Sequence, residues 1–335
     1  MKNFRRIATE EAFAIPEQFE GWKKLLKKQK EYHPDLFLSR FQVDGGPLSQ
    51  RLLDLDDERI RIMDQAGVSM HLLSLTSTGV QMFKPGKACE IAKIANDRLA
   101  EAIKAHPGRY AGLVAIAPQA PKQAAKEIER GITKLKLNGV IINSHTNGEY
   151  LDEKKYWPIL EAAEALDAPI YIHPRAPAPN MAKAFKPYHL EHAIWGYAVE
   201  TGLHGIRLIV SGIFDRFPKL KIVLGHMGEN IPWSLYRLDW MHERASVRMD
   251  RPKLKKKPSD YFKEHFYITT SGMNWDPTLL FAINVLGADR VIWAIDYPYQ
   301  EAMEATNWMN NAPISDEDKE KIFHGNAERV FHIKS

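Results

Sequence analysis

Residues 169–174 read Pro-Ile-Tyr-Ile-His-Pro, a short apolar run that ends in a histidine and a proline. A run that is apolar at every position is typical of a parallel strand covered by helices on both faces. Similar runs recur along the chain at intervals that leave room for a helix. The strand candidates are residues 6–9, 69–74, 110–116, 139–143, 169–173, 221–225, 266–270 and 291–295.

Segments with helical periodicity separate these candidates. In residues 86–105, for example, apolar residues recur every three or four positions and share one helical face. The other helical segments are residues 123–135, 155–166, 202–214, 276–286 and 316–330. Strands that alternate with helices in this way predict an α/β fold, a single (β/α)8 or TIM barrel over residues 1–335. A doubly wound open sheet is the alternative, and the polar residues at the strand ends favour the barrel.

Two segments interrupt the regular alternation. Residues 14–60 form a helix-rich insertion after the first strand, and residues 175–200 form a long loop after the fifth. Both follow the carboxyl end of a strand, the side of a barrel on which active sites form. We therefore expect them to build a lid or a contact between subunits.

The composition excludes several classes of function. The 335 residues carry a formal net charge of +4, too small a surplus to indicate a nucleic-acid-binding surface. The single cysteine, Cys89, excludes an intrachain disulfide and a zinc site built from cysteines. No apolar run is long enough to span a membrane, and no signal-type stretch follows the first residues. We expect a cytoplasmic protein that binds neither nucleic acid nor membranes.

Polar residues gather at the carboxyl ends of the predicted strands. Glu10 follows the first strand, His173 ends the fifth and Asp296 follows the eighth. Taken singly, each has an ordinary structural explanation: a carboxylate at a helix N-terminus, a hydrogen-bonded core histidine and a turn residue. In a barrel the three converge on one mouth, where buried carboxylates need a compensating charge. They predict one divalent cation, and the oxygen-rich set favours Mn²⁺, with Mg²⁺ or Zn²⁺ as alternatives.

Further polar residues are expected around the same mouth. His226 lies in a Gly-His-Met-Gly-Glu turn and is predicted to be catalytic, with Glu229 holding its tautomer or raising its basicity. The structural alternative for this turn is a helix N-cap. Arg237 can bind an anionic substrate or form a salt bridge with a nearby carboxylate. His145 and Tyr299 are expected to line the substrate pocket, and their alternatives are a loop residue and a rim aromatic.

A family resemblance rests on six motifs that together span nearly the whole chain. They are RIATEEAFA at 6–14, INSHT at 142–146, YIHP at 171–174, GHMGE at 225–229, LYRLD at 235–239 and DYPY at 296–299. The chain resembles the amidohydrolase-related nonoxidative decarboxylases of hydroxylated benzoates, which include the γ-resorcylate and 2,3-dihydroxybenzoate decarboxylases. It is most similar to the 5-carboxyvanillate decarboxylases, through the first motif, the Asn-Ser-His-Thr run and the Tyr-Pro-Tyr-Gln ending.

That resemblance implies a lyase that releases carbon dioxide from a small aromatic carboxylate, with one divalent metal and no organic cofactor. It also implies a homodimer or a homotetramer. The family's functional positions fall on the metal ligands Glu10, His173 and Asp296, the proton donor Asp296, the supporting pair His226 and Glu229, and the substrate-binding Arg237.

Some positions depart from the patterns of related families. Ala12 stands where hydrolytic amidohydrolases carry a second histidine, and residues 143–145 lack their bridging lysine, so a two-metal site is not expected. Gln300 replaces a glutamate found in several relatives, which leaves the exact substrate open. A second substrate arginine is expected in the insertion, either Arg40 or Arg51. A metal-dependent hydrolase of a cyclic amide or lactone is the alternative function, and a non-catalytic binding barrel is a second.

Overall fold

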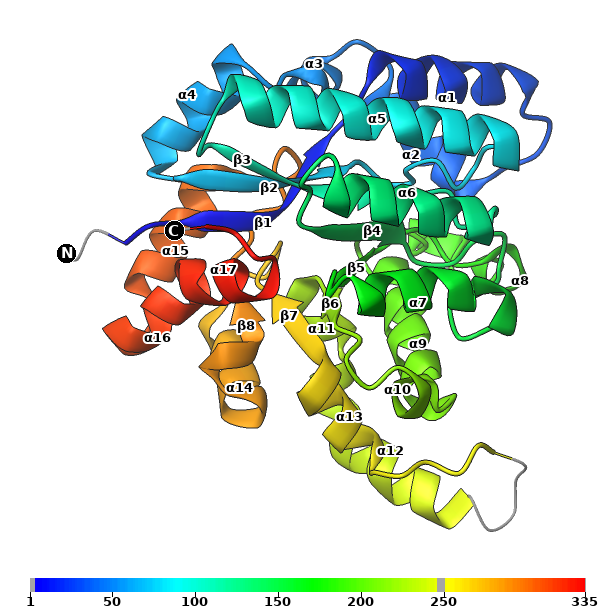
Figure 1. The fold of residues 1–335 in the computed structure, drawn as a ribbon, viewed down its shortest axis with the longest axis vertical. Coiled ribbons are helices and arrows are strands. Elements are labelled where there is room, and N and C mark those ends of the chain that lie inside the picture. The colour runs from blue at the N-terminus through cyan, green and yellow to red at the C-terminus, as the bar shows by residue number, and fades with distance from the viewer. Residues whose placement is uncertain (1–3, 246–250, 335) are drawn as a thin grey trace.

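The computed structural model describes residues 4–245 and 251–334. At its centre is an eight-stranded parallel sheet in the order β1 to β8, surrounded by helices (Figure 1). This nearly closed barrel confirms the predicted fold class. The strands are β1 Ile7–Phe13, β2 Met70–Leu75, β3 Tyr110–Ala115, β4 Gly139–Asn143, β5 Ile170–His173, β6 Ile222–Leu224, β7 Phe266–Thr269 and β8 Val291–Ile292.

The helices follow the periodic segments of the sequence, and many of them begin with proline. Proline is suited to the first helical turn because its fixed φ is already helical and its missing N–H has no partner there anyway. The larger helices are α1 Pro16–Lys28, α2 Pro34–Gln42, α3 Pro47–Leu53, α4 Asp57–Ala66, α5 Pro85–Ala105, α6 Pro121–Thr133, α7 Trp157–Ala165, α9 Gly196–Val210, α12 Ile231–Ala245, α13 Pro258–His265, α14 Asp276–Leu286 and α15 Ala302–Asn311. Shorter ones are α8 Pro179–Ala182, α10 Ile213–Arg216, α11 His226–Glu229, α16 Asp316–Glu320 and α17 Asn326–Val330. None of the described helices has the length and apolar composition of a membrane span.

Three predicted elements have clearly wrong boundaries. The first strand continues past residue 9 to Phe13, because a register shift between Ala8 and Glu11 lets it keep pairing with β2. The helix expected at 202–214 begins earlier, at Gly196, and stops at Val210, because Gly212 adopts a left-handed conformation with φ 79°. The eighth strand keeps ladder pairing only at its first two residues, Val291 and Ile292.

A buried carboxylate joins the two ends of the sheet. Glu11 Oε1 accepts a hydrogen bond from the backbone N–H of Ile295 at 3.0 Å, and its Oε2 accepts one from Tyr297 N–H at 3.0 Å. Ala12 N–H also donates to Tyr297 O at 2.7 Å. Burial raises the pKa of Glu11 to about 7, although the two backbone N–H groups oppose this shift. The side chain of Glu11 thus replaces ladder bonds at the seam between β1 and the segment after β8.

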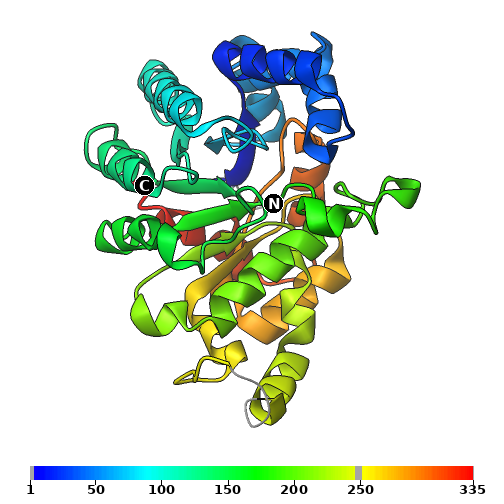
Figure 2. The ribbon, with the colours of Figure 1, turned by 90° about the vertical axis from the view of Figure 1, so that its right-hand side faces the viewer.

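The two interruptions of the barrel pattern pack against each other. In the insertion, the Phe37 ring stacks on His189 and His192, with ring centroids 5.8 Å and 5.6 Å apart. The Tyr32 hydroxyl donates a hydrogen bond to Glu191. In Figure 2 the insertion, in blue, and the segment after β5, in green, border the same end of the barrel. They meet at the end where the carboxyl ends of the strands lie.

We predict that Glu11→Gln lowers the free energy of unfolding by about 1–3 kcal/mol, because one buried backbone N–H then faces an amide NH₂ in place of an oxygen. Denaturant titration followed by circular dichroism measures the change. Glu17→Gln is the control, since Glu17 pairs with the half-exposed Arg98 and its loss costs about 1 kcal/mol or less. Equal stability of the two variants would contradict the role of Glu11 in closing the barrel.

Candidate metal centre and active site

The structure brings the three predicted metal ligands together. Glu10 lies in β1, His173 ends β5 and Asp296 follows β8. One ligand atom from each residue lies within 4.8 Å of the others. His173 Nε2 is 3.5 Å from Glu10 Oε1. Three distant parts of the chain therefore supply one compact set of donor atoms.

The two oxygens of Glu10 have different surroundings. Oε2 accepts hydrogen bonds from the hydroxyls of Tyr171 and Ser271, and from Thr269 at 3.0 Å. Oε1 is buried and has no hydrogen-bond partner. Leaving a buried carboxylate oxygen unpaired is costly. A cation that is bound between Glu10, His173 and Asp296 would satisfy this oxygen, so the residues present fit a metal ion.

His173 is held in the form that binds metals. Its Nδ1 lies 2.8 Å from the carbonyl oxygen of Pro174, which makes Nδ1 the protonated nitrogen and leaves the Nε2 lone pair facing Glu10. Burial lowers the pKa of His173, and the carboxylate of Glu10 only partly offsets that effect. The neutral imidazole is therefore favoured.

The carboxylates of this centre repel one another. Burial and then the charge of Glu10 raise the pKa of Asp296 well above its ordinary value. Burial also opposes ionisation of Glu10, but the nearby His226 and His173, together with the hydrogen bonds from Ser271 and Tyr171, outweigh burial and lower the pKa of Glu10. Gly225 permits this crowding, because a Cβ at that position would lie 2.7 Å from Glu10 Oε2. A divalent cation would relieve the repulsion, and one nitrogen with carboxylate oxygens suits Mn²⁺ or Mg²⁺.

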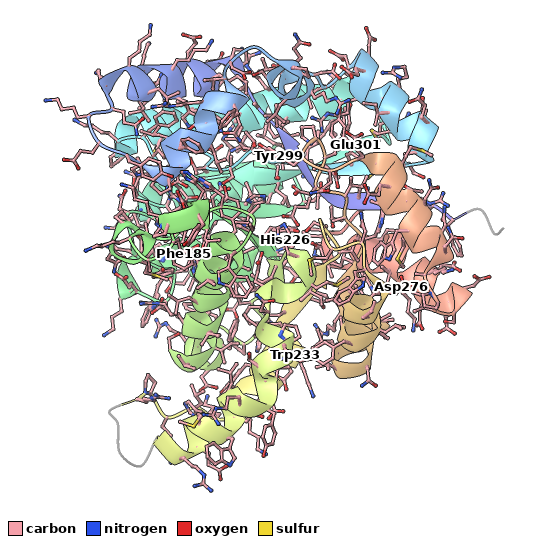
Figure 3. The ribbon with its side chains drawn as sticks, turned by 180° about the vertical axis from the view of Figure 1, so that it is seen from behind. Phe185, His226, Trp233, Asp276, Tyr299 and Glu301 are labelled. Atoms are coloured by element: carbon pink, nitrogen blue, oxygen red, sulfur yellow. The ribbon has the colours of Figure 1, made fainter. Side chains whose placement is uncertain are left out.

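His226 lies beside the metal ligands, near the centre of the face in Figure 3. Its Nδ1 is 2.8 Å from Glu229 Oε1, and its Nε2 is 3.9 Å from Glu10 Oε1. Burial lowers the pKa of His226, but the carboxylates of Glu229 and Glu10 outweigh burial and raise it to about 10. The backbone has positive φ at His226 (48°), Met227 (56°) and Glu229 (52°). Consecutive left-handed residues cost energy and cluster at functional sites, which favours the active-site interpretation over an ordinary N-cap.

Tyr299 approaches the site with its hydroxyl already engaged. The hydroxyl accepts a hydrogen bond from Gln42 Nε2 at 2.6 Å and lies 2.6 Å from Thr76 Oγ1. Gln42 belongs to α2, so this contact also ties the insertion to the segment after β8. Tyr299 can therefore offer a substrate its ring face more readily than its hydroxyl.

The contacts of His145 and Arg237 are with residues other than the three of the ligand cluster. Both ring nitrogens of His145 bind backbone: Nε2 lies 3.1 Å from Ala176 O, and Nδ1 accepts from Gly148 N–H at 3.1 Å. Burial, aided by the nearby Arg175, lowers the pKa of His145 to about 3. Arg237 is exposed on α12, with its guanidinium 5.4 Å from the centroid of the Trp240 ring.

Asp239, two residues after Arg237, and the two candidate arginines of the insertion, Arg40 and Arg51, each have a polar partner in the structure. Asp239 accepts hydrogen bonds from Ser259. Arg40 Nη2 donates to Gln29 Oε1 at 3.3 Å. Arg51 Nη1 lies 3.3 Å from Glu301 Oε1, two residues beyond Tyr299. Arg51 therefore lies beside the segment that carries Tyr299 and Glu301, two residues that are labelled in Figure 3.

Sequence reasoning missed the hydroxyl groups around Glu10. Tyr171 precedes His173 by two residues in β5, so strand alternation places both side chains on one face, and this signal was available. Thr269 and Ser271 have the same spacing at the end of β7. Gln42 and Asp35 in α2, which contact Tyr299 and Arg175, had no such signal in the sequence. They are far from these residues along the chain, and only the tertiary fold brings them together.

Comparison with known proteins identifies the class. The amidohydrolase family model matches residues 44–333, and the chain belongs to this family. The γ-resorcylate decarboxylase of Polaromonas sp. is 38% identical over 338 residues, 98% of each chain. The crystal structure of 5-carboxyvanillate decarboxylase from Sphingomonas paucimobilis is 46% identical with a TM-score of 0.96, covering 99% of this chain and 100% of that one. The 5-carboxyvanillate decarboxylase of Novosphingobium aromaticivorans, complexed with manganese and 4-hydroxy-3-methoxy-5-nitrobenzoic acid, is 40% identical with a TM-score of 0.95, covering 98% and 96%.

We predict that Mn²⁺ stabilises the metal-stripped protein, by about 2.7 kcal/mol when the free metal is 100 times the dissociation constant. Glu10→Gln should weaken Mn²⁺ binding on the order of a hundredfold or more, because it removes a ligand charge. Thermal unfolding with and without Mn²⁺ measures both effects. Glu90→Gln, which alters an exposed carboxylate on α5, should respond like the parent. An unchanged Mn²⁺ response in Glu10→Gln would place the metal elsewhere.

Proposed function

We propose that the chain is a carboxy-lyase that removes a carboxyl group from a hydroxylated benzoate, nonoxidatively and with one divalent metal. The observation that carries this proposal is the bare, buried Oε1 of Glu10, which faces His173 and has His226 3.9 Å away. Relatives with high identity over nearly the whole chain are decarboxylases of such compounds. A 5-carboxyvanillate-like substrate is the specific proposal, since two solved structures that are 46% and 40% identical to this chain are 5-carboxyvanillate decarboxylases.

Glu10, His173 and Asp296 would hold the metal, and Mn²⁺ is the proposed ion. When bound, it supplies a Lewis acid that orients and polarises the carboxylate and phenolic oxygens of the substrate. The second-histidine position of two-metal hydrolases is occupied by Ala12, whose backbone N–H and C=O bind Tyr297 and Arg59. One metal without an organic cofactor is sufficient, because the phenol of the substrate serves as the electron sink.

The proposed chemistry avoids a free aryl anion. Asp296, in its protonated form, donates a proton to the ring carbon that bears the carboxyl group. The bond to the carboxyl carbon then breaks, carbon dioxide leaves, and the electron pair returns to the ring and restores its aromaticity. His226, held by Glu229 at 2.8 Å, hydrogen-bonds the phenolic or carboxylate oxygen and adjusts its charge.

The other predicted substrate residues are assigned more limited roles. Tyr299 contributes its ring face to the pocket, because its hydroxyl binds Gln42 and Thr76. His145 shapes the pocket wall by fixing the loop after β4 against Ala176. A cytoplasmic location, predicted from the single cysteine, belongs to this proposal.

The decisive experiment is a panel of hydroxybenzoates, including 5-carboxyvanillate and γ-resorcylate, incubated with the Mn²⁺-loaded protein. We expect metal-dependent loss of substrate absorbance with equimolar carbon dioxide release. Asp296→Asn should lower kcat by about 10²–10⁴-fold, the usual contribution of a general acid. Near-parent turnover in a metal-loaded Asp296→Asn variant would refute the proton-donor role. Hydrolysis of a lactone or amide without carbon dioxide release would favour the hydrolase alternative.

We further propose a homodimer formed through the face around α12. Large apolar side chains are exposed there, including Trp233 (78%) and Tyr236 (81%). A groove of about 470 Å³ lies beside this ridge, between α9 and α12, and is lined by Leu203, Ile206 and Ile231 among others. A two-fold contact pairs one patch with itself, so the ridge of one copy can fill the groove of the other. Arg237, next to Tyr236, would then meet a substrate carboxylate in the neighbouring copy.

Complementation tests this arrangement. Glu10→Gln and Arg237→Ala homodimers should each be inactive or strongly impaired. A heterodimer of the two, purified with two tags, contains one site with intact ligands and a neighbouring Arg237, and should recover about half of the parent activity. No recovery in the heterodimer, or a monomer by light scattering, would contradict the proposal.

A further inference from the structure

The backbone that follows the metal ligand His173 is held by two other parts of the chain, one after β2 and one in the insertion. The Pro174 carbonyl oxygen lies 2.8 Å from His173 Nδ1 and accepts a hydrogen bond from Ser77 Oγ at 3.0 Å. Two residues later, Ala176 N–H donates to Asp35 Oδ1 at 3.2 Å. Ser77 follows β2, whereas Asp35 belongs to α2 of the insertion. The segment is therefore held on both sides of Arg175.

Arg175 and Asp35 form a buried ion pair. Their side chains are 3% and 2% exposed, and Arg175 Nη2 contacts Asp35 Oδ2. Arg175 Nη1 also donates to the carbonyl oxygen of His145 at 2.9 Å. Each Asp35 oxygen thus has one partner from residues 175–176: the guanidinium on one side and the backbone N–H on the other. The ion pair with Arg175 and the hydrogen bond from the Ala176 N–H together hold the insertion against the loop that follows His173.

These contacts affect the orientation of the His173 ring. The Pro174 carbonyl selects the Nδ1–H tautomer and directs Nε2 toward Glu10. The Pro174 carbonyl belongs to the peptide unit 174–175, and Asp35 holds the next unit, 175–176, through the Ala176 N–H. A displacement of that unit would therefore shift the carbonyl that faces His173. Asp35 is 138 residues from His173 in sequence (173 − 35) and is not itself near enough to be a ligand in the cluster.

We infer that Asp35, acting through Arg175 and Ala176, is a positioning residue that orients the metal ligand His173. The inference rests on the metal centre of the proposed function. A purely structural ion pair would stabilise the fold without changing the Mn²⁺ affinity of the folded protein. A positioning pair changes that affinity even where the protein stays folded.

Mn²⁺ titration of the metal-stripped protein, with free Mn²⁺ measured by electron paramagnetic resonance, tests the inference without substrate. Asp35→Asn should weaken Mn²⁺ binding by about 10–100-fold, the usual effect of removing a group that orients a ligand. Arg175→Lys, which keeps the charge but loses the planar fork, should show a smaller loss. Asp152→Asn is the matched control: it breaks another two-bond Asp–Arg pair, with Arg207 at 2.9 Å and 2.8 Å, away from the ligand loop. Its Mn²⁺ affinity should equal that of the parent.

Circular dichroism confirms that each variant tested is folded. A folded Asp35→Asn protein with parent Mn²⁺ affinity would overturn the inference, whatever its melting temperature. If Asp35→Asn does not fold, Arg175→Lys and Ser77→Ala take its place, since Ser77 holds the same Pro174 carbonyl; parent affinity in both would overturn it equally. A parent protein that binds no Mn²⁺ would instead refute the metal centre, and with it the proposed function.

Discussion

The arrangement of side chains at the mouth of this barrel depends on how the buried carboxylate of Glu10 obtains its hydrogen bonds and its compensating charge. Glu10 lies inside β1, where water does not reach it, and a carboxylate in such a place needs hydrogen bonds or positive charge on both oxygens. Hydroxyl groups from β5 and β7 satisfy Oε2. The remaining oxygen faces a neutral imidazole and a second acid, an arrangement that a cation completes. The strand ends are thus arranged as a candidate site for one cation.

Two adjacent glutamates in β1 divide structure and chemistry between them. Successive side chains of a strand point to opposite faces, so Glu10 and Glu11 meet different surroundings. Glu10 turns one oxygen to the hydroxyls and leaves the other for a metal. Both oxygens of Glu11 accept hydrogen bonds from backbone N–H groups beyond β8, those of Ile295 and Tyr297. Because Asp296 lies between these two residues, Glu11 holds it against the first strand. The seam of the barrel and the metal centre are therefore built by neighbouring residues.

The sequence was sufficient to predict the strands and the convergence of Glu10, His173 and Asp296, because both leave local signals. Eight apolar runs recur, and His173 stands at the end of one of them, where its type is conspicuous. The extension of β1 to Phe13 was missed because the charged pair Glu10-Glu11 looks like a strand end. The burial of these two glutamates is explained by hydrogen-bond partners 161 to 286 residues away. The ring of His145 has one local partner, Gly148, but its other partner, the carbonyl of Ala176, is 31 residues away and is brought near only by the fold.

The insertion shows why such long-range contacts matter for function. Its helices contribute none of the three ligands, yet they reach the site at two points, through Gln42 to Tyr299 and through Asp35 to Arg175. A buried ion pair is a poor source of net stability, because desolvation offsets most of the Coulomb attraction, but an unpaired member is strongly unfavourable. Such a pair therefore acts mainly by forbidding alternative positions of the loop. Near a metal, where ligand geometry sets affinity, restricting the loop after His173 is a more plausible reason for burying two charges than stabilising the fold.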